Sequence, residues 1–259
     1  MLKVDFPLAL LLLLALFLIQ FFGAEDEAPA PAAVLTAPPP ATPAGRSGIT
    51  LAEGGFVYED ELVSEVARMP PDQRNGTLYV RIGQTHLTPL APDLKGNLHF
   101  VNGYLVGYVP DATVAPWVPL YTLATRKAYQ TDLDQYRFEE RWQNSYEALH
   151  NERGDCEDHA LALADWLIGL GLDARVVLGK ARGEGHAWVV VNDKGRSFLL
   201  EATDKQRIRR WAYPLAQLHP EYVASDMFNR QDWWKNLGSP PGSYQDPRWK
   251  RLARYQRPR

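Results

Sequence analysis

The run from Gly154 to Ala160, together with the apolar segment that continues it, constrains the fold of this chain more than any other feature. Apolar side chains cover nearly the whole circumference of a helix in that segment: Ala160, Leu161, Ala162, Leu163, Ala164, Trp166, Leu167, Ile168 and Leu170. A helix that is apolar all round is buried on most of its sides. The sequence therefore predicts a core helix and places Cys156, the only cysteine, in its first turn.

The surroundings of Cys156 favour a reactive thiol over an inert one. A single cysteine can form neither an internal disulfide framework nor a multi-thiolate zinc site. Asp155 is expected to cap the helix, and Asp158 to complete a capping box. The orphan amides and the positive end of the helix dipole then face the sulfur and favour the thiolate. The acids Asp155, Glu157 and Asp158 oppose this effect, and a neighbouring imidazolium is expected to outweigh them.

His186 is the histidine best placed to serve that thiol. It follows the open backbone of Gly183-Glu184-Gly185 and begins an apolar strand. His159, by contrast, lies one turn after Cys156 on the same helix and is expected to pack or to cap. Trp188 shares a strand face with His186, where it either shields the imidazole from water or belongs to the ordinary core.

The acid that orients His186 is expected on the returning strand. If the turn of this hairpin is centred between residues 193 and 194, His186 and Glu201 are directly opposed, with Cβ atoms about 4.5–5.5 Å apart. A three-residue loop would break this pairing, because a slip by one residue changes the face. Asp204 is the alternative acid, and Glu201 is preferred.

A thiol, an imidazole and a carboxylate in this chain order are what covalent cysteine catalysis needs. The predicted catalytic residues are Cys156 as nucleophile, His186 as base and Glu201 as third member. The backbone amide of Cys156 is expected to hold the oxyanion, with Trp142 or Asn144 as second donor.

At these residues the chain resembles the transglutaminase-like superfamily, which has a papain-like α+β fold. The resemblance runs from about Trp142 to Asp204 and rests on Glu147-Ala148-Leu149, Arg153-Gly154-Asp155-Cys156, the apolar helix, Gly171-Leu172-Asp173-Ala174-Arg175-Val176, Gly179, His186-Ala187-Trp188 and Glu201-Ala202-Thr203. It implies a nucleophile at the start of a buried helix that packs on an antiparallel sheet. The family usually has an aspartate where Glu201 stands, so the third role departs from its pattern.

The run around Cys156 also resembles that of the bacterial transglutaminase-like cysteine peptidases of the periplasm. In those proteins acids that flank the cysteine bind calcium, and Asp155 and Glu157 match their positions. Two carboxylates are too few for a calcium site, which takes six to eight oxygens. We therefore expect no cofactor, with calcium left open.

The N-terminus is expected to lie in a membrane. Residues 1–23 carry an almost unbroken apolar stretch, residues 6–23, which is about the minimum length of a spanning helix. An uncleaved anchor is preferred over a cleaved signal segment. Lys3 precedes the stretch, so the remainder is expected outside the cytoplasm. This predicts a single-pass inner-membrane protein with its catalytic domain in the periplasm or outside the cell, joined by an Ala/Pro-rich linker, residues 24–48.

The remaining chain is divided into three parts. Residues 49–125 are expected to be an N-terminal β-rich region with a helix at 59–69, strands at 78–82 and 100–109, and a hairpin turn at Asn102-Gly103. Residues 126–230 form the catalytic core, with a helical pattern over 131–150 and strands at 174–179, 186–192 and 197–201. From Pro214 the chain is expected to be irregular. Residues 231–259 form a Trp/Arg-rich tail whose last part is solvated, so that removal of residues 246–259 should leave catalysis intact.

These features predict a membrane-anchored extracytoplasmic cysteine peptidase or amidase that acts through a thioester on a protein or peptide substrate. A transamidase would use the same three groups, and a catalytically silent binding domain would keep only the fold. The net charge of −3 carries no nucleic-acid footprint. The oligomeric state stays open.

Overall fold

The computed structural model describes residues 45–70, 74, 76–82, 86–205 and 213–258. The chain divides into residues 1–32 and a second compact unit, residues 33–259, and the description below concerns the second unit alone. The expected membrane segment and most of the expected linker therefore lie outside the described residues. None of the helices described here is long and apolar enough to cross a bilayer.

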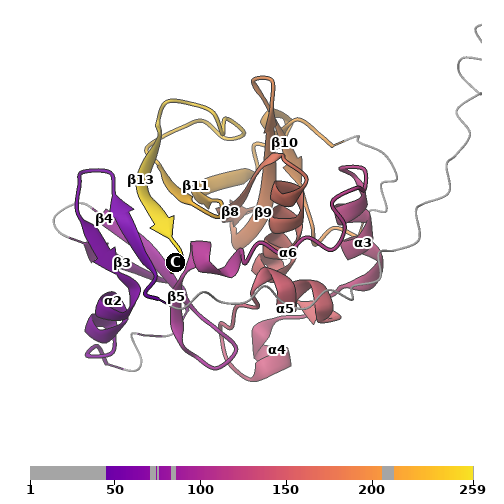
Figure 1. Cartoon of the computed structure of the whole chain (residues 1–259). Helices are drawn as coiled ribbons and strands as arrows, with labels where there is room; N and C mark the ends of the chain where they lie inside the picture. The colour runs from indigo at the N-terminus through magenta and orange to yellow at the C-terminus, as the bar shows by residue number, and fades with distance from the viewer. Residues whose placement is uncertain (1–44, 71–73, 75, 83–85, 206–212, 259) are drawn as a thin grey trace, which may run out of the picture. The chain divides into compact units, whose positions relative to one another are not determined.

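An eight-stranded antiparallel sheet forms the centre of this unit (Figure 1). Its strands, in spatial order, are β10 (Arg196–Leu200), β9 (Glu184–Asp193), β8 (Asp173–Ala181), β11 (Tyr222–Phe228), β12 (Asp232–Asn236), β13 (Trp249–Gln256), β1 (Gly48–Leu51) and β2 (Phe56–Tyr58). The first and last described strands of the chain, β1 and β13, are direct neighbours. The N-terminal and C-terminal segments of the unit therefore belong to the same sheet.

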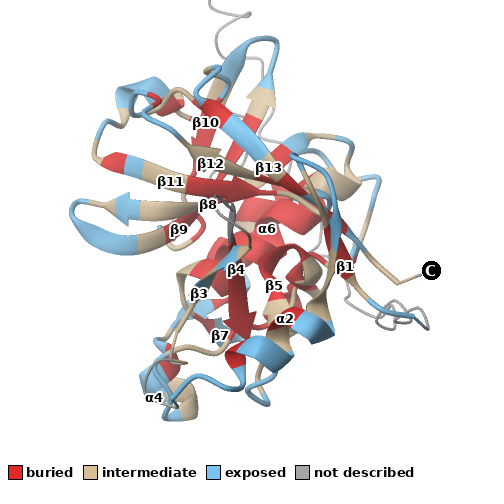
Figure 2. Ribbon diagram, turned by 90° about the vertical axis from the view of Figure 1, so that its left-hand side faces the viewer, coloured by how far each residue is buried: buried red, intermediate tan, exposed pale blue. Residues whose placement is uncertain are grey.

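Helix α6 (Cys156–Gly169) packs on β8 and β9 and is buried along nearly its whole length (Figure 2). Its side chains share one apolar core with the inward-facing residues Val176, Val189 and Val191 of the two strands. The prediction of a core helix is therefore confirmed, as is the prediction of a buried helix on an antiparallel sheet. Gly171 follows the helix with φ +84°, a value that glycine adopts without strain.

The β9–β10 hairpin was predicted as a pair of strands, and its register differs from the predicted one. Lys194 and Gly195 both have positive φ, as in a two-residue hairpin turn, and Asp193 pairs with Arg196. The turn is thus centred one residue later than expected, and β10 ends at Leu200, opposite Val189. This moves the pairing by two positions, which leaves each side chain on its expected face.

The predicted helical pattern over 131–150 is wrong in its middle, where two short helices replace one. Helix α4 (Asp132–Tyr136) ends at Arg137, whose φ is +64°. Helix α5 (Ser145–His150) begins at Asn144, which forms a capping box with Glu147. Nearby lie α3 (Val118–Arg126) and a two-stranded parallel pair, β6 (Ala128–Tyr129) with β7 (Arg153–Gly154).

The N-terminal part holds the predicted helix and the first predicted strand as α2 (Glu59–Val66) and β3 (Leu78–Ile82). Strand β3 pairs with β4 (His86–Pro92), which pairs with β5 (Leu98–Phe100). The strand predicted over 100–109 and its turn at Asn102-Gly103 are wrong. Residues Val101–Tyr104 form a 3₁₀ helix, η2, because the buried Asn102 amide donates to the carbonyls of Asn229 and Asp232.

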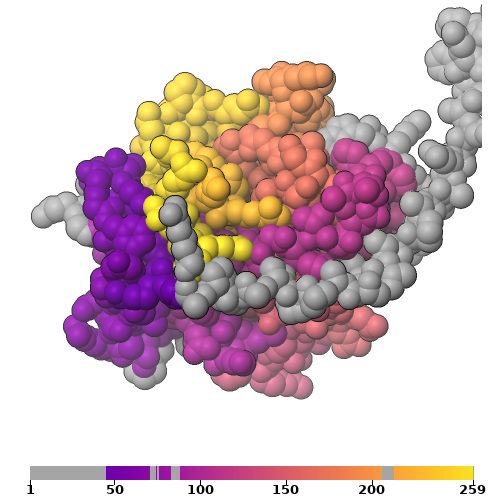
Figure 3. Space-filling view, viewed as in Figure 1, coloured from indigo at the N-terminus to yellow at the C-terminus, as the bar shows by residue number. Residues whose placement is uncertain are grey.

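The C-terminal part is ordered sheet instead of the expected irregular chain and solvated tail. After a short 3₁₀ helix, η3 (Ala216–Leu218), strands β11, β12 and β13 follow in sequence. Strand β13 lies between β12 and β1, and Figure 3 shows the yellow and indigo segments side by side. Its basic side chains face solvent while Trp249, Ala253 and Tyr255 are buried. The expectation that this segment is dispensable loses its basis.

Candidate functional site

Cys156 is held at the start of α6 by a close approach that requires glycine before it. A Cβ atom on Gly154 would collide with the Asp158 carboxylate and lie 2.7 Å from Nζ of Lys127. That ammonium donates to the carbonyl oxygen of Arg153 at 2.8 Å, which ties β7 to the end of α3. Gly154 therefore fixes where the helix begins and how the half-buried thiol is presented.

The predicted capping box at α6 is wrong, although Asp155 does occupy the N-cap position. Its side chain makes no capping hydrogen bond. The carboxylate of Asp158 accepts from the backbone N–H of Gln143 at 2.8 Å and from Nε2 of Gln143 at 2.5 Å. Buried Asp158 thus anchors the segment before α5 and leaves the first turn of α6 without a side-chain cap.

His186 and Glu201 form the contact that the sequence predicted. Nε2 of His186 lies 2.8 Å from Oε2 of Glu201. The hydroxyl of Tyr222 donates to the same oxygen at 2.9 Å, and Thr203 donates to Oε1 from its backbone N–H (3.0 Å) and its hydroxyl (2.6 Å). Since Nε2 is engaged by Glu201, Nδ1 is the ring nitrogen left to hydrogen-bond the side chain of Cys156.

The pair carries opposite charges over a wide range of pH. Burial lowers the pKa of His186, but the hydrogen bonds to Cys156 and Glu201 raise it to about 10. Burial raises the pKa of Glu201, whereas the contact with His186 and the bonds from Thr203 lower it to about 2. At neutral pH the imidazolium is therefore anchored by the carboxylate on one side and faces the sulfur on the other.

Aromatic rings enclose this ion pair on the sheet side. The indole of Trp188 is fully buried, stacks 6.1 Å from the His186 ring and donates to the hydroxyl of Tyr244 at 3.0 Å. Gly179 lies opposite His186, and a Cβ there would approach the Trp188 ring to 2.9 Å and collide with the carbonyl oxygen of Val223. Trp188 thus serves as core and as a cover for the imidazole.

The two residues predicted as second donors for an oxyanion both have hydrogen-bond partners of their own. Trp142 is 1% exposed and its indole N–H donates to Glu140 at 2.6 Å. The Asn144 side chain accepts from the backbone N–H groups of Tyr146 and Glu147 as the N-cap of α5. The Trp142 N–H is thus committed to Glu140, and the side-chain oxygen of Asn144 to the start of α5.

An acidic cluster lies beside Cys156 and could hold a metal ion. Carboxylate oxygens of Asp132, Asp155 and Glu157 lie within 4.8 Å of one another. Each of the three has one buried oxygen without a hydrogen-bond partner. Burial and the charge of Asp155 raise the pKa of Asp132 to about 7, and burial with nearby negative charge also raises that of Glu157. A divalent cation would relieve this repulsion.

Asp132 was missed by the reading of the sequence. Its buried carboxylate accepts from the backbone N–H of Arg141, a contact that no local pattern predicts. The thiol of Cys156 is in direct contact with this cluster, because its Sγ donates to Oε2 of Glu157 at 3.3 Å. The cluster and the thiol therefore share one carboxylate.

His159 is fully buried, as a packing residue would be, and it links the nucleophile helix to the segment after Glu201. Its Nδ1 lies 2.6 Å from the carbonyl oxygen of Asp155, and its Nε2 lies 2.7 Å from Nζ of Lys205. The ring of Tyr129 stacks on it at 6.3 Å. Lys205 and Tyr129 were not singled out from the sequence.

Comparison with known families points to a peptidase-like domain. The family model described as the CEP76 peptidase-like domain matches residues 140–242, a range that contains Cys156, His186 and Glu201. The chain is thus similar to that domain over the segment that builds the site.

The centrosomal protein of 76 kDa is a relative of this kind. The Xenopus tropicalis protein is 45% identical over 53 residues and the Mus musculus protein 47% identical over 53 residues, in each case 20% of this chain and 8% of the relative. The matched stretch is thus a small part of those relatives.

Among solved structures, Legionella pneumophila LapG is similar in its calcium-bound form with a TM-score of 0.39 and 16% identity, over 53% of this chain and 78% of that one. Its EGTA-treated form gives a TM-score of 0.39 and 17% identity, over 52% and 74%.

Proposed function

We propose that this chain is a transglutaminase-like cysteine hydrolase, a peptidase or amidase, with Cys156, His186 and Glu201 as its catalytic residues. The observation that carries the proposal is the chain of contacts from Glu201 through His186 to the sulfur of Cys156. A nucleophile, a base and an acid that orients the base are the recurring parts of covalent acyl transfer.

The mechanism follows from these contacts. The thiolate sulfur of Cys156 attacks the amide carbonyl carbon. The C–S bond forms, and the carbonyl oxygen takes the negative charge of the tetrahedral intermediate. The uncapped amides of the first turn of α6 are the nearest fixed dipoles for that oxygen. The His186 imidazolium gives its Nδ1 proton to the leaving nitrogen, the C–N bond breaks, and a thioester remains. Water then attacks the thioester carbonyl carbon while Nδ1 of His186 accepts one of its protons. The C–S bond breaks, which releases the carboxylic acid and restores the thiolate of Cys156 beside the imidazolium.

Calcium is part of this proposal as a structural aid. Asp132, Asp155 and Glu157 would hold it, because their unpartnered buried oxygens are the hard ligands that calcium prefers. A bound cation would neutralise the acids beside Cys156 and fix the start of α6.

The proposed location is the periplasmic or outer side of the inner membrane, with residues 1–23 as the anchor. The support is the apolar stretch over residues 6–23 with Lys3 before it. A reporter fusion to residues 1–48 tests this: activity of an alkaline phosphatase reporter, which needs an oxidising compartment, supports export. Activity of a cytoplasmic reporter instead contradicts it.

Two alternative functions use the same fold. A transamidase would pass the acyl group to an amine instead of water, and a silent domain would bind peptide without turning it over. The His186–Glu201 contact favours chemistry over silence, because a binding domain has no need of a charged imidazole aimed at a thiol.

The deciding experiment compares the wild-type protein with Cys156→Ala on a panel of fluorogenic peptides and peptide amides, with and without a fluorescent primary amine. Hydrolysis that disappears in Cys156→Ala supports the proposal. Incorporation of the amine in place of hydrolysis would instead identify a transamidase. Equal inactivity of both proteins, with peptide binding retained, would identify the silent domain and refute the proposed chemistry.

A further inference from the structure

We propose that Lys205 and Tyr129 form a subsite beside Cys156 that binds a carboxylate of the substrate, carried by an acidic residue next to the reacting amide. This inference rests on the proposed function, because it names the substrate class of the same site.

The imidazole of His159 fixes the position of the Lys205 ammonium. A carbonyl oxygen only accepts hydrogen bonds, so Nδ1 of His159 carries the proton in its contact with Asp155. Nε2 then offers its lone pair, and Nζ of Lys205 donates to it at 2.7 Å. Because both ring nitrogens are engaged in this way, the imidazole holds the ammonium in one place.

The ammonium at Lys205 also has no carboxylate partner of its own within the part of the chain that the structure describes. Burial lowers the pKa of Lys205 to about 8, and the charge of Glu201 opposes this shift. The two oxygens of Glu201 are already engaged by His186, Thr203 and Tyr222. Since one N–H of the ammonium goes to His159, two donors remain for a ligand.

The exposed ring of Tyr129 connects this ammonium to the reacting sulfur. It stacks on His159 and is 52% exposed. Tyr129 pairs with Gly154, two residues before Cys156, so this residue lies beside the start of α6. A substrate chain that passes the sulfur can therefore pack against this ring and reach Lys205.

Electrostatics make such a cation necessary for an acidic substrate. Asp132, Asp155 and Glu157 lie beside Cys156, and without a bound cation their field repels a carboxylate. Lys127 also acts on His159, but its buried ammonium donates to Gln143, Asn151 and Arg153. Lys205 is therefore the nearby cation with donors left for negative charge on a substrate.

The first test measures alkylation of Cys156, the only thiol, by iodoacetate and by iodoacetamide, which differ by one negative charge. The readout is the ratio of the two rate constants at fixed pH and ionic strength. Lys205→Gln keeps a donor for His159 but removes the charge, and we expect the ratio to fall about three- to tenfold.

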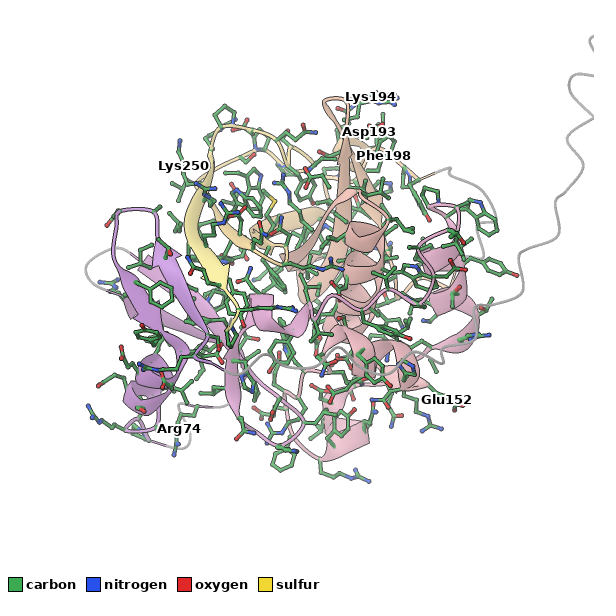
Figure 4. The ribbon with its side chains drawn as sticks, in the orientation of Figure 1. Arg74, Glu152, Asp193, Lys194, Phe198 and Lys250 are labelled. Atoms are coloured by element: carbon green, nitrogen blue, oxygen red, sulfur yellow. The ribbon has the colours of Figure 1, made fainter. Side chains whose placement is uncertain are left out.

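The matched control is Lys250→Gln, which removes the same charge from an exposed position on β13, far along the sheet (Figure 4). Its ratio should equal that of the wild type. An unchanged ratio in Lys205→Gln, with a wild-type melting temperature, would overturn the subsite; an equal fall in both variants would show a general charge effect and overturn it as well.

The second test uses pairs of peptide substrates that differ by glutamate against glutamine at one position beside the reacting amide. We expect a lower KM for one glutamate peptide, lost in Lys205→Gln and reversed toward a lysine peptide in Lys205→Glu. If the alkylation ratio responds to Lys205 but no peptide is hydrolysed, the subsite stands and the proposed hydrolysis falls. If peptides are hydrolysed with no preference for glutamate and the alkylation ratio does not respond to Lys205, the proposed hydrolysis stands and the subsite falls.

Discussion

The length of the Glu201 side chain explains how an acid beyond the end of β10 reaches His186. The observed register sets Leu200 opposite Val189, so residue 201 is level with Trp188 and lies diagonally from His186. The diagonal neighbour on a sheet face is within reach of a long side chain. A glutamate spans this offset, whereas the shorter aspartate that the resemblance implies would suit a directly opposed position.

The His186–Glu201 pair should give the protein a stability that depends on pH. The pKa of Glu201 falls from 4.5 to about 2 on folding, so its contribution is present above pH 4.5 and is lost toward pH 2. The pKa of His186 rises from 6.5 to about 10, so its contribution is present below pH 6.5 and is lost toward pH 10. Glu201→Gln should therefore cost most, about 1–3 kcal/mol, between pH 4.5 and 6.5.

Urea unfolding of wild type and Glu201→Gln at pH 3, 5.5 and 9.5 measures this difference. Tyr222→Phe is the control, since it removes one hydrogen bond to the Glu201 carboxylate but leaves the contact with His186 in place. Its cost should vary less with pH than that of Glu201→Gln. A Glu201→Gln cost that does not vary with pH would contradict the charged pair.

Gly179 should be intolerant of any side chain, whereas Gly185 on the same hairpin should accept one. A Cβ at Gly179 meets the backbone of β11 and the Trp188 ring, but a Cβ at Gly185 meets nothing within 4 Å. We expect Gly179→Ala to cost about 1–3 kcal/mol in unfolding free energy and Gly185→Ala less than about 0.5 kcal/mol. Equal losses of stability in the two variants, measured by thermal unfolding, would show that Gly179 has room for a Cβ atom.

At the scale of elements, the sequence predicted what depends on strong local periodicity. Helix α6 and the strands β8, β9 and β10 were predicted because their apolar patterns are long and unbroken. The break between α4 and α5 was not, because it depends on Arg137 taking a left-handed conformation and on a cap at Asn144. Likewise η2 forms around buried tertiary bonds of Asn102, which no local pattern announces.

The candidate site divides in the same way. Cys156, His186 and Glu201 could be singled out because each lies in a distinctive local run. Asp132, Lys205 and Tyr129 come near them only through contacts between distant segments. Their roles could not be inferred without the pairing of β6 with β7, which brings the segment of Tyr129 beside the start of α6.

Helix α4 should couple calcium binding to stability through Asp132. Calcium at a hundredfold excess over Kd should raise the melting temperature by about 5–10 °C, and EGTA should reverse the rise. Asp132→Asn should abolish this response, while Glu139→Gln, which removes an exposed acid just after α4, should keep it. A calcium response that survives in Asp132→Asn would show that the ion binds elsewhere.

At the scale of the whole described unit, the sheet depends on β13. Deletion of residues 246–259 removes the strand that joins β12 to β1 and its buried residues Trp249, Ala253 and Tyr255. We expect the truncated protein to lose its cooperative thermal transition. Lys250→Gln, which alters only the solvent face of β13, should unfold as the wild type does. A truncated protein with normal circular dichroism and melting would restore the view of this segment as a tail.

The pairing of β1 with β13 also sets an order of events during synthesis. Gly48 emerges from the ribosome early, but its partner Gln256 is made only after the residues of the candidate site. Until that late segment appears, β1 and β2 have no strand to join, and such long-range pairing is slow to form. The nascent polypeptide therefore carries its thiol, imidazole and acid for some time before the sheet beneath them is complete, so the candidate site is assembled only when synthesis is nearly finished.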